Sequence, residues 1–177
     1  MIRLFAALAI PPEIAEGLVR RQAGLSGAQW RPTPAFHITL RFFGDLQEAV
    51  AADLDVELAR IAAPSLDLEL SGVGAFGEGR DIHAVWAGVS DSPALTALHK
   101  ACERATRRVG LAPDSRRYMP HVTLAYLKRA NPVDVAQWIA DHNLLRSPSF
   151  RLSEFGLYSS RQTEEGSRYR LERAYPL

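Results

Sequence analysis

One four-residue pattern occurs twice in the chain, as His-Ile-Thr-Leu beginning at His37 and as His-Val-Thr-Leu beginning at His121. From the composition of the chain, a given histidine is followed by Ile or Val, then Thr, then Leu with a probability of roughly 1 in 2,500, so two such matches are not expected by chance. Alternation of polar and apolar residues is typical of a half-buried β-strand. The repeat therefore predicts two copies of one strand, which the fold must place in equivalent positions.

The faces of these two strands follow from the period of a β-strand. Residues i and i+2 point to the same side, so His37 and Thr39 share one face while Ile38 and Leu40 face the core. The second copy gives the same result, with His121 and Thr123 on one face. Each strand thus presents an imidazole and a hydroxyl on the face opposite the apolar side chains that pack into the core.

The rest of the chain alternates between strand-like and helix-like patterns. Each half contains a His-x-Thr-Leu strand followed by a helix and a strand pair. We therefore predict an α+β fold of two similar lobes, each an antiparallel sheet with helices on its outer face, around a central cleft in a single domain spanning 1–177. The predicted strands are 3–10, 36–43, 66–71, 82–89, 121–127, 150–158 and 169–175, the predicted helices are 12–23, 47–62, 92–109 and 133–142, and the longest predicted loops are 72–81, 112–120 and 161–168.

Composition narrows the class of protein. The chain of 177 residues is 47% hydrophobic, which is enough for a core, and it has no apolar run of the length that a transmembrane helix requires. Its one cysteine, Cys102, excludes an intrachain disulfide and fits a reducing compartment. We expect a cytoplasmic monomer without a membrane segment. The net charge of +1 predicts that any contact with RNA comes from a local basic patch.

Two imidazoles and two hydroxyls that meet across a cleft have a specific chemical use. With ordinary pKa values near ~6.5, one neutral histidine can act as a base while a protonated one acts as an acid. The hydroxyls of Thr39 and Thr123 can donate hydrogen bonds to the non-bridging oxygens of a phosphate. This set suits in-line displacement at phosphorus, with His37 and His121 as the acid–base pair and with no metal ion or other cofactor.

The paired motifs resemble those of the two-histidine phosphoesterase superfamily. Within it, the chain is most similar to the bacterial and archaeal RNA 2′,3′-cyclic phosphodiesterase family, whose members are also called 2′-5′ RNA ligases. The paired motifs are the part of the resemblance that is specific to this family, and the other similar segments are supporting evidence. The segments that carry the resemblance are RLFAALAIPPE (3–13), HITLRFFGDL (37–46), GVGAFG (72–77), HAVWAGV (83–89), RYMPHVTLAYL (117–127) and LYSSRQTEEGSRYRLERAYPL (157–177).

The resemblance implies a reaction and a role for each residue. The protein would open a terminal ribose 2′,3′-cyclic phosphate of RNA to a 2′-phosphate, and its partners would be RNA ends or nucleotides that carry this group. His121 would activate the water and His37 would protonate the departing 3′ oxygen. Thr39 and Thr123 would hold the phosphate. Family members also join or cleave 2′-5′ linkages in RNA.

The chain departs from the family pattern at Tyr126, where the family usually has an arginine that contacts the phosphate or nucleotide. Strand alternation makes Arg41 a candidate for the missing cation, because it would share a face with His37. Arg117 and Lys128 flank the second motif and are further candidates. We expect the aromatic rings of Tyr126 and Phe43 to stack on a base of the RNA. We expect Tyr169 at the edge of the cleft.

Three other functions remain open from the sequence alone. One is a phosphoesterase of the same fold that acts on small cyclic or 2′-5′-linked nucleotides, whereas a basic flank long enough for several nucleotides would favour RNA. A non-catalytic RNA-binding module has no need for both histidines. A metal hydrolase would use the histidines as ligands, but each stands beside threonine rather than the Asp or Glu of a typical site.

Overall fold

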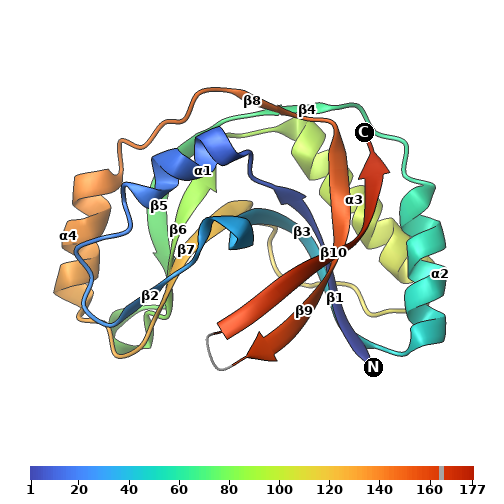
Figure 1. The fold of residues 1–177 in the computed structure, drawn as a ribbon, viewed down its shortest axis with the longest axis horizontal. Helices are drawn as coiled ribbons and strands as arrows, with labels where there is room; N and C mark the ends of the chain where they lie inside the picture. Colours follow the sequence, from blue (N-terminus) through green and yellow to red (C-terminus); the bar gives the residue numbers. More distant parts are fainter. Residues whose placement is uncertain (164–165) are drawn as a thin grey trace.

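Residues 1–163 and 166–177 are described by the computed structural model, in which a β-sheet forms an arch with helices on its outer side (Figure 1). The helices are α1 (Pro12–Val19), α2 (Glu48–Ala59), α3 (Pro93–Arg108) and α4 (Pro132–His142), with short 3-10 turns η1 (Thr33–Ala35) and η2 (Gly79–Asp81). The strands are β1 (Ile2–Ala9), β2 (Ala28–Trp30), β3 (His37–Leu46), β4 (Leu66–Leu68), β5 (Leu70–Phe76), β6 (Ala84–Val89), β7 (His121–Leu127), β8 (Phe150–Leu152), β9 (Glu154–Thr163) and β10 (Gly166–Pro176).

The main sheet consists of two halves, each with its own helices. Among the described residues it has eight strands in the order β10-β9-β1-β3-β7-β6-β5, with β2 paired to β7, and its strand pairs are antiparallel. Helix α3 packs against β3 and α2 packs against α3, whereas α4 packs against β5. Strands β4 and β8 form a separate two-stranded sheet. The expected α+β class, with antiparallel sheets and outer helices, is confirmed.

The two halves meet at β3 and β7, the two strands that carry the repeated motif. Their ladder consists of one residue pair, Ile38 opposite Val122, and both side chains are fully buried. Residues that lie directly opposite each other point to the same side of a sheet. Extending this register places His37 across from Thr123 and Thr39 across from His121, all on the side away from the core.

Two β-bulges interrupt the pairing of β3 with β1. Ala6 and Ala7 lie opposite Arg41 and Thr39, so Leu40 is an extra residue on β3. A second shift, between Leu4 and Phe5, leaves Phe43 as another extra residue just before Gly44. Gly44 has a φ of +81°, which glycine adopts without the steric cost that a Cβ brings.

These bulges explain the main departure from the predicted elements. The sequence places the end of the first motif strand at Gly44, but β3 continues through the second bulge to Leu46.

Strand β2 is also absent from the sequence prediction, because its three residues are too few to show a period. Most of the predicted loop 72–81 belongs to strand β5 and turn η2. The predicted loop 161–168 is largely the ends of β9 and β10, and residues 164 and 165 lie outside the described part of the chain.

The helices begin and end where local chemistry allows. Before α3, the Ser92 hydroxyl accepts a hydrogen bond from the backbone N–H of Leu95 at 3.2 Å, and Pro93 occupies the first turn. Gly110 follows this helix with a φ of +78°, as expected for a C-terminal cap. Within the described residues, none of these helices is long and apolar enough to cross a membrane.

Candidate active site

His37, Thr39, His121 and Thr123 line one cleft of about 280 Å³ between the two halves of the sheet. The structure thus brings together the four residues that the repeat singles out, as the register of Ile38 and Val122 requires. The other residues that line this cleft are Arg3, Phe5, Arg31, Ala35, Phe42, Tyr126, Ser160, Ser167 and Tyr169.

The two histidines are held in the same way. Nδ1 of His37 lies 2.8 Å from the carbonyl oxygen of Ala35, and Nδ1 of His121 lies 2.7 Å from that of Met119. A carbonyl oxygen can only accept, so each Nδ1 carries the proton and donates it. In the neutral form of each ring, Nε2 is therefore the atom with a free lone pair, available to accept a proton.

Aromatic rings fix the orientation of each imidazole. Phe5 lies against His37 with ring centroids 5.0 Å apart, and Tyr169 meets the same imidazole edge-on at 5.0 Å. Around His121, Phe76 meets the ring edge-on at 4.8 Å and Trp86 lies at 6.3 Å. These rings cover part of each imidazole, and the resulting loss of hydration disfavours the charged form.

The pKa values of both histidines lie below their ordinary range. Burial lowers the pKa of His37 from 6.5 to about 4, the hydrogen bond to Ala35 opposes that shift, and the positive charge of Arg31 adds to it. Burial also lowers the pKa of His121. In the free protein both rings are therefore neutral at pH 7. A bound anion favours the protonated form of a histidine and raises its pKa.

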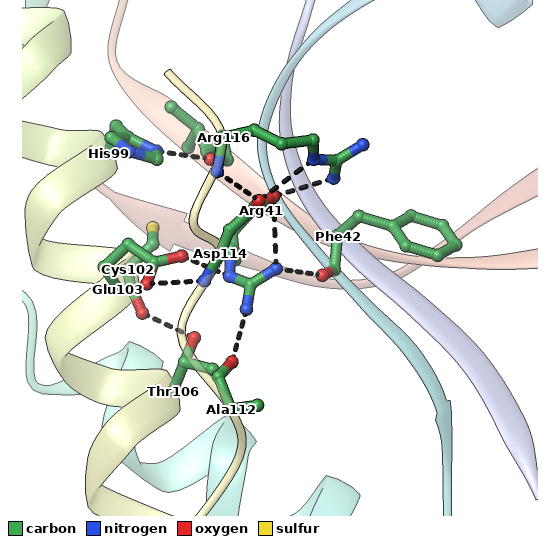
Figure 2. Close-up of polar contacts among 10 residues, drawn as sticks. Arg41, Phe42, His99, Cys102, Glu103, Thr106, Ala112, Asp114 and Arg116 are labelled. Atoms are coloured by element: carbon green, nitrogen blue, oxygen red, sulfur yellow. Dashed lines mark hydrogen bonds and ion pairs between the residues drawn. The ribbon is translucent and has the colours of Figure 1, made fainter. Parts of the chain in front are cut away.

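Arg41 does not reach this cleft, contrary to the expectation from strand alternation. Its guanidinium group forms an ion pair with Glu103 of α3, lies 3.6 Å from Asp114, and donates to the carbonyl oxygen of Ala112 at 2.7 Å (Figure 2). The bulge at Leu40 is the reason, because the extra residue turns the side chain of Arg41 to the side that faces α3.

Of the four other candidates for substrate contact, one lines the cleft and three do not. Phe43, the second bulged residue, packs against the core, and it is Phe42 that lines the cleft instead. Arg117 and Lys128 are exposed and do not line the cleft. Tyr126 does line it, with 41% of its surface exposed.

Sequence reasoning missed Arg31 and Arg3 as cleft residues. Arg31 follows the short strand β2, and its guanidinium carbon lies 5.5 Å from the ring centroid of Tyr126 and 5.4 Å from that of Tyr169. Arg3 lies over Phe42 and pairs with Asp45 at 3.1 Å. The only signal in the sequence was the position of Trp30-Arg31-Pro32 shortly before the first motif. Tyr169 lies in the cleft, as expected.

No group of three or more His, Cys, Asp or Glu side chains within residues 1–163 and 166–177 is placed to hold a metal ion together. The groups that the cleft offers to a ligand are therefore imidazole nitrogens, hydroxyls, phenols and guanidinium groups. Such a set matches an oxyanion, which accepts hydrogen bonds from each of these donors.

Comparisons with known proteins agree with this chemistry. A family model described as the 2′-5′ RNA ligase superfamily matches residues 10–164. The RNA 2′,3′-cyclic phosphodiesterase of Aeropyrum pernix is 34% identical over 137 residues, which covers 76% of this chain and 78% of the relative. The enzyme of that name from Archaeoglobus fulgidus is 27% identical over 172 residues, covering 96% and 97%. A crystal structure of Escherichia coli LigT complexed with 3′-AMP is 25% identical, with a TM-score of 0.79 and coverage of 99% and 98%.

The ion pair of Arg41 predicts a stability effect. We expect Arg41→Met to lower the free energy of unfolding by about 3–5 kcal/mol, because it leaves the carboxylate of Glu103 largely buried and without its partner. The double substitution Arg41→Met with Glu103→Leu should recover much of this loss. Urea denaturation measures both. As a control, Arg116→Met removes an exposed partner of Asp114 and should cost at most about 1 kcal/mol. A loss for Arg41→Met no larger than that of the control would contradict the buried pair.

The pKa of His37 predicts a pH effect on stability. Between its ordinary pKa of 6.5 and its value of about 4 in the folded protein, the unfolded chain binds a proton that the folded protein does not. The free energy of unfolding should therefore fall as the pH drops through this window. His37→Asn keeps a donor for the carbonyl oxygen of Ala35 but cannot titrate. Urea denaturation at several pH values should show a steeper fall for the unmodified protein than for His37→Asn, and equal slopes would refute the lowered pKa.

Proposed function

Because the chain belongs to the 2′-5′ RNA ligase superfamily, we infer that it is an enzyme that hydrolyses the terminal ribose 2′,3′-cyclic phosphate of RNA. The observation that carries this inference is the meeting of two His-x-Thr motifs in one cleft. Relatives that match most of the chain are named RNA 2′,3′-cyclic phosphodiesterase. RNA or nucleotide ends with this group are therefore its substrates.

We propose the following reaction. Nε2 of one neutral imidazole removes a proton from water, and the water oxygen forms a bond to phosphorus. The bond between phosphorus and the ribose 3′ oxygen breaks, and the other, protonated imidazole gives its proton to that oxygen. The product carries a 2′-phosphate. The hydroxyls of Thr39 and Thr123 donate to the non-bridging oxygens, whose negative charge grows in the transition state.

In this proposal His121 is the base and His37 is the acid, as the family resemblance implies. The low pKa of His37 means that the acid is not formed in the free protein at pH 7. The bound phosphodiester carries a negative charge, and an anion beside an imidazole raises its pKa. Binding of the substrate is therefore the step that must protonate His37.

The reaction needs no metal ion in this scheme, because the two imidazoles supply both proton transfers. Joining RNA ends by a 2′-5′ linkage would use the same groups with a ribose 5′ hydroxyl in place of water. We also propose that residues 1–177 act as one two-lobed domain in a cytoplasmic monomer. Each lobe supplies one motif to the cleft, and Cys102 is fully buried as a free thiol.

Loss of either histidine should strongly reduce turnover. We expect His37→Ala and His121→Ala each to reduce kcat at least ~10²-fold, because each removes one of the two proton transfers. The assay uses an oligoribonucleotide ending in a 2′,3′-cyclic phosphate, in EDTA, with the product identified as a 2′- or 3′-phosphate. His142→Ala, which removes a histidine outside the cleft, serves as the control.

Each outcome of this assay separates the competing functions. Near-normal turnover in either cleft variant would rule out the two-histidine reaction. Activity that disappears in EDTA would favour a metal hydrolase. Turnover of small cyclic nucleotides but not of the oligonucleotide would favour a nucleotide phosphoesterase, and binding that survives both substitutions without turnover would favour an RNA-binding module.

The division of labour between the histidines has its own test. A substrate with sulfur at the bridging 3′ position releases a thiolate, which leaves without a proton. On this substrate the defect of His37→Ala should shrink at least ~10-fold relative to the oxygen substrate, because the acid is no longer required. The defect of His121→Ala should persist. The reverse pattern would make His37 the base.

A further inference from the structure

Arg31 is a buried cation with no carboxylate partner in the part of the chain that the structure describes. Its exposed fraction is 8%, and it is the only arginine among the buried residues of the described chain. Within residues 1–163 and 166–177, no Asp or Glu lies within ion-pair distance of its guanidinium group. Burial of a charge without a partner is unfavourable. A side chain in this state is expected to have an anionic ligand.

The rest of the cleft holds Arg31 firmly in place. Its guanidinium group contacts the rings of Tyr126 and Tyr169 and donates to the carbonyl oxygen of Ser167 at 3.0 Å. Its backbone N–H donates to the carbonyl oxygen of Leu124, in the second motif, at 2.8 Å. These contacts order the side chain before any ligand binds, which lowers the entropic cost of binding.

None of these contacts, all within the described residues, brings a negative charge to the guanidinium group. The tyrosine rings attract a cation only through their quadrupoles, and burial raises the pKa of Tyr169, so its phenol stays neutral beside the guanidinium group. Among the described residues, the side chain of Arg31 donates one hydrogen bond, and its acceptor is the neutral carbonyl oxygen of Ser167. A guanidinium group has five N–H donors in a planar fork, an arrangement that matches two oxygens of a phosphate.

Arg3, the other arginine of the cleft, is in a different state. It already pairs with Asp45 at 3.1 Å, and half of its side chain is exposed to solvent. Its charge is therefore both neutralised and screened. Arg31 also lies near enough to the first motif for its charge to act on His37. Of the two, Arg31 is the one suited to an anion at the histidines.

We propose that Arg31 binds the phosphate of the substrate, and so supplies the cation that Tyr126 does not. Tyr126 has no positive charge to offer the phosphate, and its ring instead packs against the guanidinium group of Arg31. This inference rests on the proposed function for the identity of the substrate. Its central claim, an anion site at Arg31, is tested separately with inorganic phosphate.

The first experiment measures the dissociation constant of inorganic phosphate by isothermal titration calorimetry. We expect Arg31→Met to weaken phosphate binding at least ~10-fold, and Arg31→Lys to weaken it by a smaller factor, because an ammonium group keeps the charge but lacks the planar fork. Arg146→Met, which removes an exposed cation paired with Glu69 outside the cleft, is the matched control and should bind as the unmodified protein does.

A second arm separates a ligand contact from a purely structural role. In the Arg31→Met background, Tyr126→Arg returns a guanidinium group to the neighbouring position and should restore at least part of the phosphate affinity. A variant that had merely lost its packing would not be rescued in this way. Absence of rescue, with both variants folded by circular dichroism, would overturn the proposal.

The remaining outcomes are also decisive. Phosphate affinity within ~2-fold of the unmodified protein in both Arg31→Met and Arg31→Lys would overturn the proposal, as would an unmodified protein that does not bind phosphate. If Arg31→Met does not fold, the phosphate affinity of Arg31→Lys is compared with that of Arg146→Met. A weaker affinity in Arg31→Lys supports the proposal, and an equal affinity overturns it. If phosphate binding depends on Arg31 but the cyclic phosphate is not turned over, the proposed function fails and the anion site stands.

Discussion

The site depends on one backbone pairing, Ile38 opposite Val122, at the centre of the sheet. This pair anchors the two motif strands in the core and directs the four polar side chains of the motifs to the other face. Because β3 and β7 share no further ladder pair, each strand belongs to its own half of the sheet, and the cleft lies between the halves. A shift of the register by one residue would turn one motif into the core. The position of both histidines is therefore fixed by packing.

The bulge at Leu40 determines which side chains join the histidines. It turns Arg41 toward α3, where the arginine ties β3 to the helix and to the segment before the second motif. It also brings Phe42 into the cleft. The same irregularity thus removes a cation from the site and makes that cation part of the framework. The positive charge near the histidines comes instead from Arg31, which directly follows strand β2.

The sequence was sufficient for the parts of the structure that follow a period. The repeat and its alternation predicted both motif strands, the face of each histidine and their meeting in a cleft. The departures are found where the period breaks. The extra residue at Leu40 has no signature in the apolar pattern, because Leu40 falls where strict alternation expects a core residue and the alternation breaks only after it, so Arg41 was placed on the wrong face. Arg31 was missed because its role depends on Tyr126 and Tyr169, which are distant in sequence and come together only in the fold.

The electrostatics of the cleft link binding of the anion to the chemistry. Among the described residues the charge of Arg31 has no carboxylate counter-ion, and it contributes to the low pKa of His37. A phosphate at this position neutralises the guanidinium group and places a negative charge beside the imidazole, so both changes raise the pKa of His37. By linkage, binding of the anion and uptake of a proton must then favour each other. Under the proposed function, the acid of the reaction is therefore formed when the substrate is in place, and the free enzyme keeps both histidines neutral.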